Sequence, residues 1–353
     1  MNHQPAAPRA RSRSTLKDVA LHAGVSVKTV SRVVNGEPGV VDELSSRVRA
    51  AISELNYQPN LGARALRRRD RRSSTIAVLL EDLSNPYSAR VLRAIEEVAH
   101  ERAVAVLAAS LEENPERERQ LIAAMSRHRV DGVILAPASD DHGYLAVEQG
   151  AGVPFVFVDR PPRHLAADAV VVDARDATRA AVAHLLAAGH RRVAYLGDLT
   201  RIATALERRA GYRDALGDAH LAEDPELVVM ELHSVEAAQA AATRLLALPD
   251  PPTAFFAGQN LLTMGVVYAL RARGLAQRVA LAGFDDFDLA DVLEPAVTVV
   301  AQDLEAVGRR AAELLFARVD GAQGPPRLEA PATRLICRGS GEIAGPAALT
   351  RLH

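Results

Sequence analysis

The chain has 353 residues, 48% of them hydrophobic and 24% charged, and its mean hydropathy is close to zero. This length and composition indicate a soluble globular protein of two or three domains. The single cysteine, Cys337, excludes an intramolecular disulfide framework and a zinc–cysteine cluster. Because the sequence also lacks a run of about 18 apolar residues, we expect a cytoplasmic protein without a membrane partner.

Charge is divided unequally along the chain. Residues 1–75 carry 14 Lys and Arg against 6 Asp and Glu, a balance of +8, whereas the remainder carries 28 against 38, a balance of −10. A basic head on an acidic body is typical of a protein that presents one end to a polyanion. The alternative is a solvated basic tail without a partner. Residues 1–14 lack the apolar core of a secretory signal, and we expect them to form a flexible basic arm.

Residues 15–59 carry the pattern of a helix-turn-helix. Apolar residues at helical spacing predict two short helices, the first with Leu16, Val19, Ala20 and Ala23 and the second with Val27, Val30, Val33 and Val34. Gly24 supplies the positive φ of the tight turn between them, and Ser26 is placed to cap the second helix. This geometry presents the second helix outward, toward the major groove of DNA.

Beyond residue 75, short apolar runs alternate with longer helical segments. The predicted strands are 76–80, 104–108, 132–136 and 154–158, followed by 192–197, 227–230, 253–257 and 279–284. The predicted helices are 86–101 and 115–127, followed by 174–188, 204–216, 235–248 and 260–273. This alternation predicts two doubly wound α/β lobes with parallel sheets and a ligand at the carboxyl ends of the strands. The basic run at residues 67–72 connects the head to this body.

These segments resemble the lactose-repressor/galactose-repressor (LacI/GalR) family of bacterial transcription factors, from about residue 15 to about residue 335. The motifs that carry the resemblance are TLKDVALHAGVSVKTVSRVVNG and YQPNLGARAL in the head and DLSNPY (82–87), RVDGVILAPA (129–138), VPFVFVDRP (153–161), GHRRVAYLG (189–197), ERRAGY (207–212), GFDD (283–286) and PAVTVVAQD (295–303) in the body. The resemblance implies homodimerisation and effector-controlled binding of an operator in double-stranded DNA.

The same resemblance divides the chain into domains. It implies a helix-turn-helix head at 15–59, a hinge helix and linker at 60–75, a periplasmic-binding-protein-like (type I) effector domain at 76–343 and a tail at 344–353. By the family pattern the chain crosses three times between two lobes. The lobe that is close to the head in the family comprises residues 76–173 plus 300–327, and the distal lobe comprises residues 174–299 plus 328–343.

In this family the positions of Val27, Lys28 and Arg32 select the base sequence. Arg32 and Lys28 can donate to guanine O6 and N7, and Val27 can contact a thymine methyl group. We expect four further side chains to contact phosphates: Ser26, Thr29, Ser31 and Asn35. The alternatives are that Val27 packs into the head's own core and that Arg32 is a solvated charge.

The resemblance implies that the hinge helix orders only on the operator, with Leu66 wedged into the minor groove. Ala63 and Arg64 would accompany Leu66, and Arg67 would reach the groove wall or a phosphate. A helix of this length is unstable alone because helix nucleation is unfavourable. An apolar wedge kinks the duplex at a cost of a few kcal/mol, which wider contact must offset. The alternative is that Leu66 anchors the linker on the body.

The third helix of the head departs from the family pattern. Val41 stands where the family usually has a capping Ser or Thr. We therefore expect Asp42 to serve as a displaced cap, with the helix beginning one residue late.

The resemblance also implies an effector site, lined by Tyr87, Ser88, Asp159, Arg208, Gln259, Asp285 and Leu304. A carboxylate that accepts from vicinal hydroxyls beside a guanidinium that donates in a fixed fork suits a polyol. Gln259-Asn260 replaces the family's commoner Asn-Asp, and Leu304 replaces an aromatic residue of some sugar-responsive relatives. A sugar or sugar derivative is the first expectation, and a nucleobase-like metabolite stays open.

Each of these assignments has a structural alternative. Asp285 could cap the turn after its strand, and Arg208 could pair with Glu207 or Asp159 for structural reasons. Tyr87 could form a wall of the site rather than donate to the ligand.

The sequence contains none of the common catalytic motifs: no HExxH helix, GxSxG elbow, P-loop or GxGxxG after a strand. His184 and His190 lack a metal-ligand spacing, and Cys337 is expected to be a small buried residue. We therefore expect no enzyme, cofactor or metal site. The predicted function is a sequence-specific DNA-binding transcriptional regulator, a repressor by family habit. The alternative is a soluble metabolite-binding protein whose head no longer reads DNA.

Overall fold

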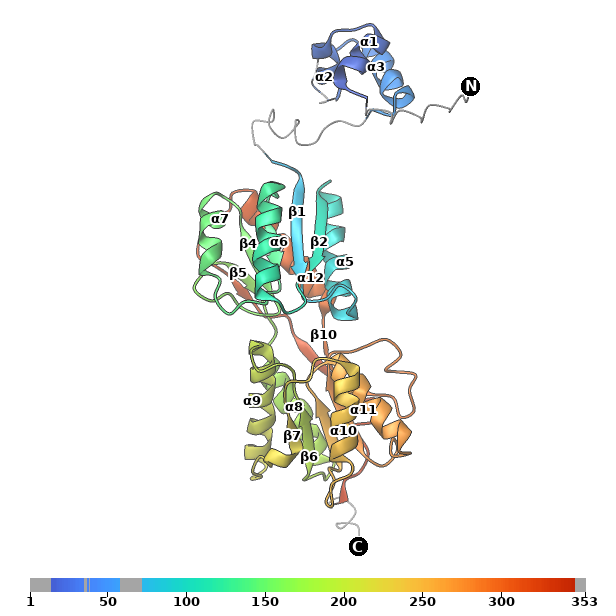
Figure 1. The fold of residues 1–353 in the computed structure, drawn as a ribbon, viewed down its shortest axis with the longest axis vertical. Helices are drawn as coiled ribbons and strands as arrows, with labels where there is room; N and C mark the ends of the chain where they lie inside the picture. Colours follow the sequence, from blue (N-terminus) through green and yellow to red (C-terminus); the bar gives the residue numbers. More distant parts are fainter. Residues whose placement is uncertain (1–13, 35–36, 38, 58–71, 347–353) are drawn as a thin grey trace, which may run out of the picture. The chain divides into compact units, whose positions relative to one another are not determined.

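The protein is represented by a computed structural model, which describes residues 14–34, 37, 39–57 and 72–346 (Figure 1). The chain divides into two compact units, Met1–Ser73 and Ser74–His353. The predicted arm, hinge helix and end of the tail lie wholly or mostly outside the described residues.

The described residues of the head form three helices, α1 (Leu16–Ala23), α2 (Val27–Val34) and α3 (Asp42–Glu54). Gly24 adopts φ 62° directly after α1, as the turn requires, and the Ser26 hydroxyl accepts a 3.0 Å hydrogen bond from the Thr29 amide at the start of α2. These two sequence predictions are confirmed. The small core of the head comprises Val19, Ala20, Ala23, Val30, Val48, Ala51 and Tyr57.

The expected capping role of Asp42 is wrong. Asp42 is the first residue of α3, and Val41 is its N-cap without a side-chain hydrogen bond. The Val41 carbonyl oxygen accepts the first bond of the helix, from the Ser45 amide at 3.0 Å. Because the N-cap is defined by that carbonyl, the helix keeps its start despite the poor capping residue.

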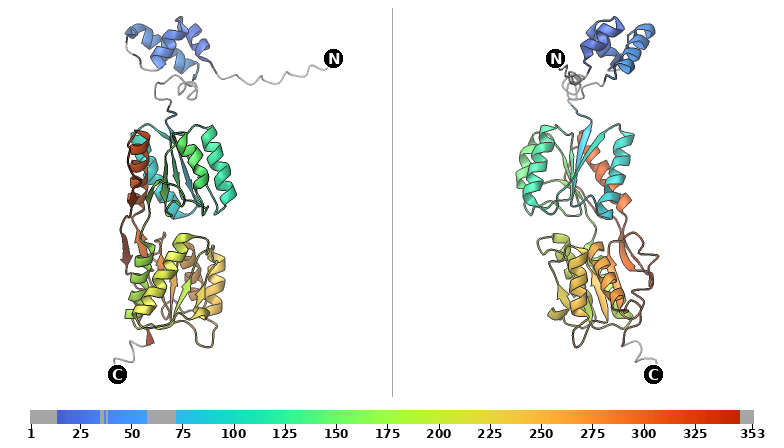
Figure 2. Two further views of the ribbon diagram at one scale, coloured as in Figure 1. Left: turned by 90° about the vertical axis from the view of Figure 1, so that its left-hand side faces the viewer. Right: turned by 45° about the vertical axis from the view of Figure 1, so that its right-hand side comes forward.

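The second unit contains two lobes, each built on a six-stranded sheet with helices on both faces (Figure 2). The first sheet has the order β11-β5-β4-β3-β1-β2, and all its neighbouring strands are parallel. Its strands are β1 (Thr75–Leu80), β2 (Ala105–Ser110), β3 (Val133–Leu135), β4 (Phe155–Val158), β5 (Asp168–Val170) and β11 (Leu328–Glu329). Its helices are α5 (Pro86–Glu101), α6 (Pro115–Arg127), η1 (Gly143–Leu145), α7 (Ala146–Gly150) and α12 (Leu304–Val319).

The second sheet has the order β12-β10-β9-β8-β6-β7. Its strands are β6 (Val193–Leu196), β7 (Val228–Val229), β8 (Ala254–Ala257), β9 (Ala280–Phe284), β10 (Thr298–Gln302) and β12 (Thr333–Ile336). Its helices are α8 (Ala174–Ala187), α9 (Ala203–Asp218), η2 (Pro225–Leu227), α10 (Val235–Leu245) and α11 (Asn260–Ala272). The prediction of parallel sheets is correct except for β12, which pairs antiparallel with β10.

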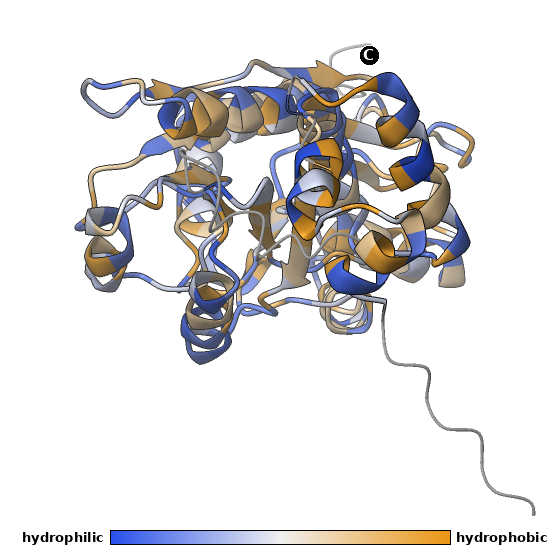
Figure 3. Ribbon diagram, turned by 90° about the horizontal axis from the view of Figure 1, so that it is seen from above, coloured by the Kyte–Doolittle hydropathy of each residue, from blue (hydrophilic) through white to orange (hydrophobic). Residues whose placement is uncertain are grey.

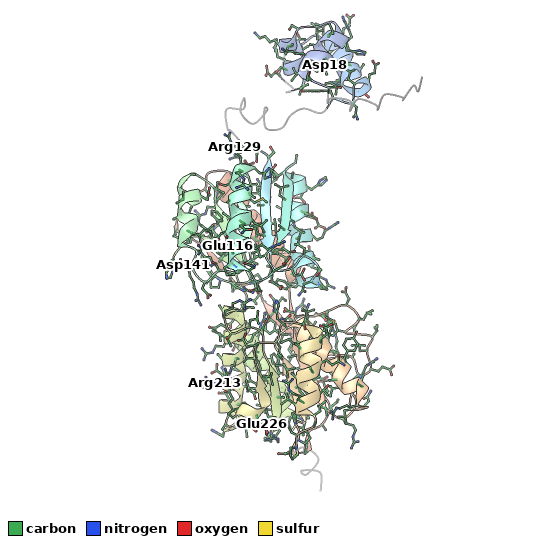
Figure 4. The ribbon with its side chains drawn as sticks, in the orientation of Figure 1. Asp18, Glu116, Arg129, Asp141, Arg213 and Glu226 are labelled. Atoms are coloured by element: carbon green, nitrogen blue, oxygen red, sulfur yellow. The ribbon has the colours of Figure 1, made fainter. Side chains whose placement is uncertain are left out.

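Both faces of the inner strands of each sheet are buried, as their continuous apolar runs predict, whereas the edge strand β2 is partly exposed. In β1, Ile76 and Val78 pack against α5 and α12, whereas Ala77 and Leu79 join the core on the opposite face. The helix ribbons carry both hydrophobic and hydrophilic stretches, as amphipathic helices do (Figure 3). Charged side chains such as Arg213 and Glu226 lie exposed on the surface (Figure 4). None of the helices in the described residues is long and apolar enough to span a membrane.

The two lobe crossings near the end of the chain differ from the family-based boundaries. β10 belongs to the second sheet through Gln302, although a boundary after residue 299 is expected, and β11 belongs to the first sheet, although residue 328 is expected in the other lobe. Figure 1 shows β10 running between the lobes. Hydrogen-bond partners, which local sequence does not reveal, decide the sheet of a crossing strand. α12 and the strands β5, β10, β11 and β12 are also absent from the predicted series.

Gly211 allows the close crossing of α9 and α8. A Cβ at this position would overlap the backbone carbonyl oxygen of Arg175, whereas a Cβ at Gly217, on the same helix, would point into open space. We expect Gly211→Ala to destabilise the second unit by about 1–3 kcal/mol through overpacking. Gly217→Ala should be neutral or stabilising by up to about 1 kcal/mol, because alanine favours the helix. Thermal unfolding followed by circular dichroism measures both, and equal effects of the two variants would contradict this packing.

Candidate functional site

The outer face of α2 carries the residues predicted to read bases. Val27 is 43% exposed and Lys28 is exposed, whereas Val30 is fully buried in the head core. Val27 therefore does not pack into the core. Ser26 is exposed, and Thr29 and Ser31 are partly exposed on the same short helix. The start of α2 thus presents side chains outward, as contact with a DNA groove requires.

Arg32 lies nearer the end of α2 and is partly exposed. Its Nε atom is 3.6 Å from a carboxylate oxygen of Glu37. This ion pair would have to open before the guanidinium could reach a guanine. Four other predicted DNA-binding residues lie outside the described part of the chain: Asn35, Ala63, Leu66 and Arg67.

Polar side chains follow the ends of parallel strands in both lobes. Asp159 comes directly after β4, Gln259 comes two residues after β8, and Asp285 comes directly after β9. Asp159 and Asp285 both have positive φ, 66° and 67°. Non-glycine residues in this conformation are uncommon and tend to occur at functional sites.

Arg208, on α9, is 6% exposed. Its Nη1 donates to the Gly258 carbonyl oxygen at 2.8 Å, its Nη2 lies 3.9 Å from Asp285 Oδ2, and its guanidinium lies 4.0 Å from the centre of the Phe284 ring. The ion-pair partner of Arg208 is therefore Asp285, and not Glu207 or Asp159 as in the structural alternative. Its Nε is buried without a hydrogen-bond partner. A buried donor of this kind is costly unless a ligand or water accepts from it.

Asp285 is 8% exposed, and its Oδ1 accepts a 2.6 Å hydrogen bond from Gln302 Nε2. Burial raises the pKa of Asp285, the Asp159 carboxylate raises it further, and Arg208 and Gln302 oppose the shift. The side chain thus accepts a hydrogen bond from the amide of Gln302, the last residue of β10, and does not only cap the turn after β9.

Tyr87 lies near the start of α5 in the first lobe, and charged side chains of both lobes shift the pKa of its phenol. Burial raises the pKa of its phenol well above the ordinary value, and the carboxylates of Asp159 and Asp285 add to this effect. The cationic Arg208 lowers it. We call Tyr87, Asp159, Arg208 and Asp285 the interlobe site, because the structure brings these four predicted residues together.

The other three predicted effector residues have different surroundings. Ser88 is 2% exposed, Leu304 packs against the core of the first lobe, and Gln259 Nε2 donates to Asp198 at 2.6 Å. The amide of Gln259 is therefore engaged by a carboxylate of its own lobe.

A histidine that sequence analysis missed joins the lobes. His233 Nδ1 lies 2.7 Å from Asp198 of the second lobe, and His233 Nε2 lies 3.1 Å from Glu81 of the first lobe. Hydrogen bonds to these two carboxylates raise the pKa of His233 to about 10, so the imidazolium donates to both at neutral pH. No spacing signals this bridge, because Glu81 and His233 are 152 residues apart in the chain.

Further polar contacts lie beside this bridge. Asn260 Nδ2 donates to Asn85 Oδ1 at 2.9 Å, and both amides are buried between the lobes. Arg160, next to Asp159, is held by two hydrogen bonds to Glu113 and one to the Pro137 carbonyl oxygen. In the Asn85–Asn260 and Glu113–Arg160 pairs alike, exchange of one residue for a hydrophobic one would leave its partner buried and unpaired.

The His233 bridge predicts a pH-dependent stability. Because the folded pKa of about 10 exceeds the ordinary 6.5, the stabilisation is complete below about pH 6.5 and is lost as pH rises through 10. We expect His233→Gln to lower the melting temperature by a few degrees at pH 6, because each kcal/mol lost from the free energy of unfolding lowers it by about 2–4 °C. The difference from wild type should vanish above pH 10. Calorimetry from about pH 6 to about pH 11 measures this difference, because the range spans both pKa values. His100→Gln, which changes an exposed histidine on α5, is the control. A difference that stays constant with pH would contradict the bridge.

An outward-facing helix-turn-helix, followed by a two-lobed α/β unit with polar strand ends, defines a DNA-binding transcriptional regulator. Residues 15–60 match the model of bacterial regulatory proteins of the lacI family, and residues 182–341 match the periplasmic binding protein-like domain. The regulator DegA of Bacillus subtilis is 32% identical over 84% of this chain and 88% of its own length. The regulator PtxS of Pseudomonas plecoglossicida is 33% identical over 95% and 98%. The chain belongs to the lacI family.

Solved structures agree with this membership. The lac repressor dimer bound to operator and an anti-inducer is 26% identical, with a TM-score of 0.81, over 94% of this chain and 99% of that one. The complex of the regulator CelR with cellobiose is 32% identical, with a TM-score of 0.68, over 93% and 100%. These relatives are transcriptional regulators, and their fold is the one described above.

Proposed function

We propose that this regulator represses transcription by binding a roughly palindromic operator as a homodimer, and that a sugar or sugar derivative bound between the lobes controls this binding. The observation that carries the effector proposal is Arg208, a buried guanidinium with an unpartnered Nε beside the Asp285 carboxylate. The relatives support the proposal, because they include a ribose operon repressor of Haemophilus influenzae and the CelR–cellobiose complex. The protein would act in the cytoplasm, where its DNA lies.

On the DNA side, Val27 and Lys28 would contact base edges from the exposed start of α2. Arg32 would join them once its pair with Glu37 opens. Ser26, Thr29, Ser31 and Asn35 would contact phosphates, which position the head without specifying sequence. By family resemblance, Leu66 would wedge into the minor groove with Ala63 and Arg64 beside it, and Arg67 would reach the groove wall or a phosphate.

The Lys28 assignment predicts a loss of base preference. We expect Lys28→Ala to weaken binding of the preferred operator by about 1–3 kcal/mol and to relax selection at one base pair in each half-site. Arg49→Ala is the matched control, since it removes one exposed positive charge from α3. Operator selection from a random DNA library at one stated salt concentration, followed by fluorescence anisotropy, measures both variants.

Two results would contradict these assignments. An unchanged motif in Lys28→Ala would remove Lys28 from base reading. Salt-sensitive binding of wild type without any sequence preference would favour a metabolite-binding protein with a degenerate head.

On the ligand side, the interlobe site combines groups that suit vicinal hydroxyls. The carboxylates of Asp159 and Asp285 accept hydrogen bonds, and the guanidinium of Arg208 donates in a fixed direction. Tyr87 adds a phenol that stays protonated and can donate. Gln259 is bound to Asp198 and Leu304 packs on the core, so these two would shape the site rather than hold the ligand.

The ligand would act through the arrangement of the lobes. Glu81–His233 and Asn85–Asn260 hold the two lobes together beside the site. Arg90 of α5 adds a third link, a 2.7 Å ion pair with Asp288 of the second lobe. An effector that binds one lobe arrangement more tightly shifts the population toward it, by no more than its differential affinity.

Arg208→Gln tests the effector site. Thermal shift of wild type against a panel of monosaccharides, sugar acids and purine bases first identifies a ligand. We expect Arg208→Gln to weaken that ligand more than tenfold, because a charge-assisted hydrogen bond contributes about 1.5–3 kcal/mol. Arg209→Gln is the control: Arg209 neighbours Arg208 on α9 but pairs with Glu223 at 2.9 Å.

A second variant keeps the test interpretable if Arg208→Gln misfolds. Asp285→Asn keeps the shape of the side chain and should also weaken the ligand. Retained affinity in both variants, measured by calorimetry on folded protein, would place the ligand elsewhere.

A further inference from the structure

Three side chains with metal-ligating atoms meet in the second lobe, outside the interlobe site. His184 lies on α8, Cys337 follows β12 directly, and Glu342 lies five residues later. His184 Nε2 or Nδ1, Cys337 Sγ and a Glu342 carboxylate oxygen all lie within 4.8 Å of one another. Because 153 residues separate His184 from Cys337, no sequence motif indicates this cluster. The cysteine is exposed, contrary to the expectation that it is buried.

The distances within the cluster suit a small tetrahedral ion. His184 Nε2 lies 2.6 Å from Glu342 Oε1 and 3.9 Å from Cys337 Sγ. Zinc binds nitrogen and oxygen at about 2.0–2.1 Å and sulfur at about 2.3 Å, which places tetrahedral ligand atoms about 3.5 Å apart. The histidine–carboxylate pair would therefore widen by somewhat less than about 1 Å and the sulfur would move slightly inward.

The surrounding residues hold the glutamate in a ligating orientation. Glu342 Oε2 accepts hydrogen bonds from the Gly339 amide at 2.5 Å and the Thr298 hydroxyl at 2.9 Å. These bonds occupy one carboxylate oxygen and leave the other directed at His184. Thr298, the first residue of β10, is fully buried and gives this support a rigid base. Hydrogen bonds to ligating carboxylates orient metal sites in the same way.

We propose that His184, Cys337 and Glu342 bind one zinc-type divalent transition-metal ion, with water as the fourth ligand. A thiolate with an imidazole selects a transition metal over magnesium or calcium, which prefer oxygen ligands alone. The exposed cysteine gives the ion access from solvent and leaves a position for water.

The ion would link three elements of the second lobe. It joins α8 to the segment after β12 and, through Glu342 and Thr298, to β10, the strand that leads into the first lobe. An ion that binds only the folded lobe raises its stability by mass action. The site is independent of the effector site and does not rest on the proposed function.

Cobalt absorption tests the site directly. Untagged, reduced full-length protein is titrated with Co²⁺ and then with Zn²⁺. Since the chain has a single cysteine, a thiolate-to-cobalt band in the near ultraviolet reports this site alone. We expect one ion per chain, displacement of Co²⁺ by Zn²⁺ and complete loss of the band in Cys337→Ser.

Ligand variants and a matched control complete the test. We expect His184→Gln and Glu342→Gln to raise the Zn²⁺ dissociation constant at least tenfold. The control is His164→Gln, which removes a surface histidine that lies 3.1 Å from Asp141 in a pair without a thiol. This variant should change the Zn²⁺ dissociation constant less than twofold. Cobalt binding without the thiolate band, equal zinc affinity of wild type and Cys337→Ser, or one ion per two chains would overturn the proposal. Because Cys337 is exposed, its serine variant keeps the test valid even if His184→Gln misfolds.

Discussion

Parallel strands end at one edge of their sheet, and in each lobe that edge carries residues that contact the other lobe. Glu81 follows β1 and Asp198 lies two residues after β6, and the two meet through His233. Asp159 and Asp285 follow β4 and β9 with the same left-handed backbone. The interlobe site exists because this topology brings the strand-end residues Asp159 and Asp285 close to Tyr87 of α5 and Arg208 of α9, which are far apart in the chain.

Burial then determines the chemistry of the gathered residues. A buried charge is costly unless it is paired, and at this site the pairing is incomplete. Arg208 retains a free Nε, and Asp285 has a raised pKa despite Arg208 and Gln302. A ligand with hydroxyl groups would pair with these atoms, so their incomplete pairing within the protein would contribute to its binding energy.

The crossing strands connect the interlobe site to other parts of the molecule. β10 belongs to the second sheet and leads directly into α12, which packs on the first sheet, and β12 returns antiparallel beside it. Gln302, the last residue of β10, bonds Asp285 of the interlobe site. Thr298, at the other end of β10, supports the Glu342 carboxylate of the proposed metal site. One strand thus contacts the interlobe site, the proposed metal site and the passage between the lobes.

The sequence alone determined what depends on near neighbours. Gly24 and Ser26 set the turn and cap of the head, and helices α5 and α6 begin and end at the predicted residues, because capping and periodicity are local. Family resemblance supplied the four residues of the interlobe site. Tertiary structure alone decided the sheets of β10 and β11, the partner of Arg208, the His233 bridge and the meeting of His184 with Cys337. Each of these depends on contacts between distant segments, which only the packing of the folded chain brings together.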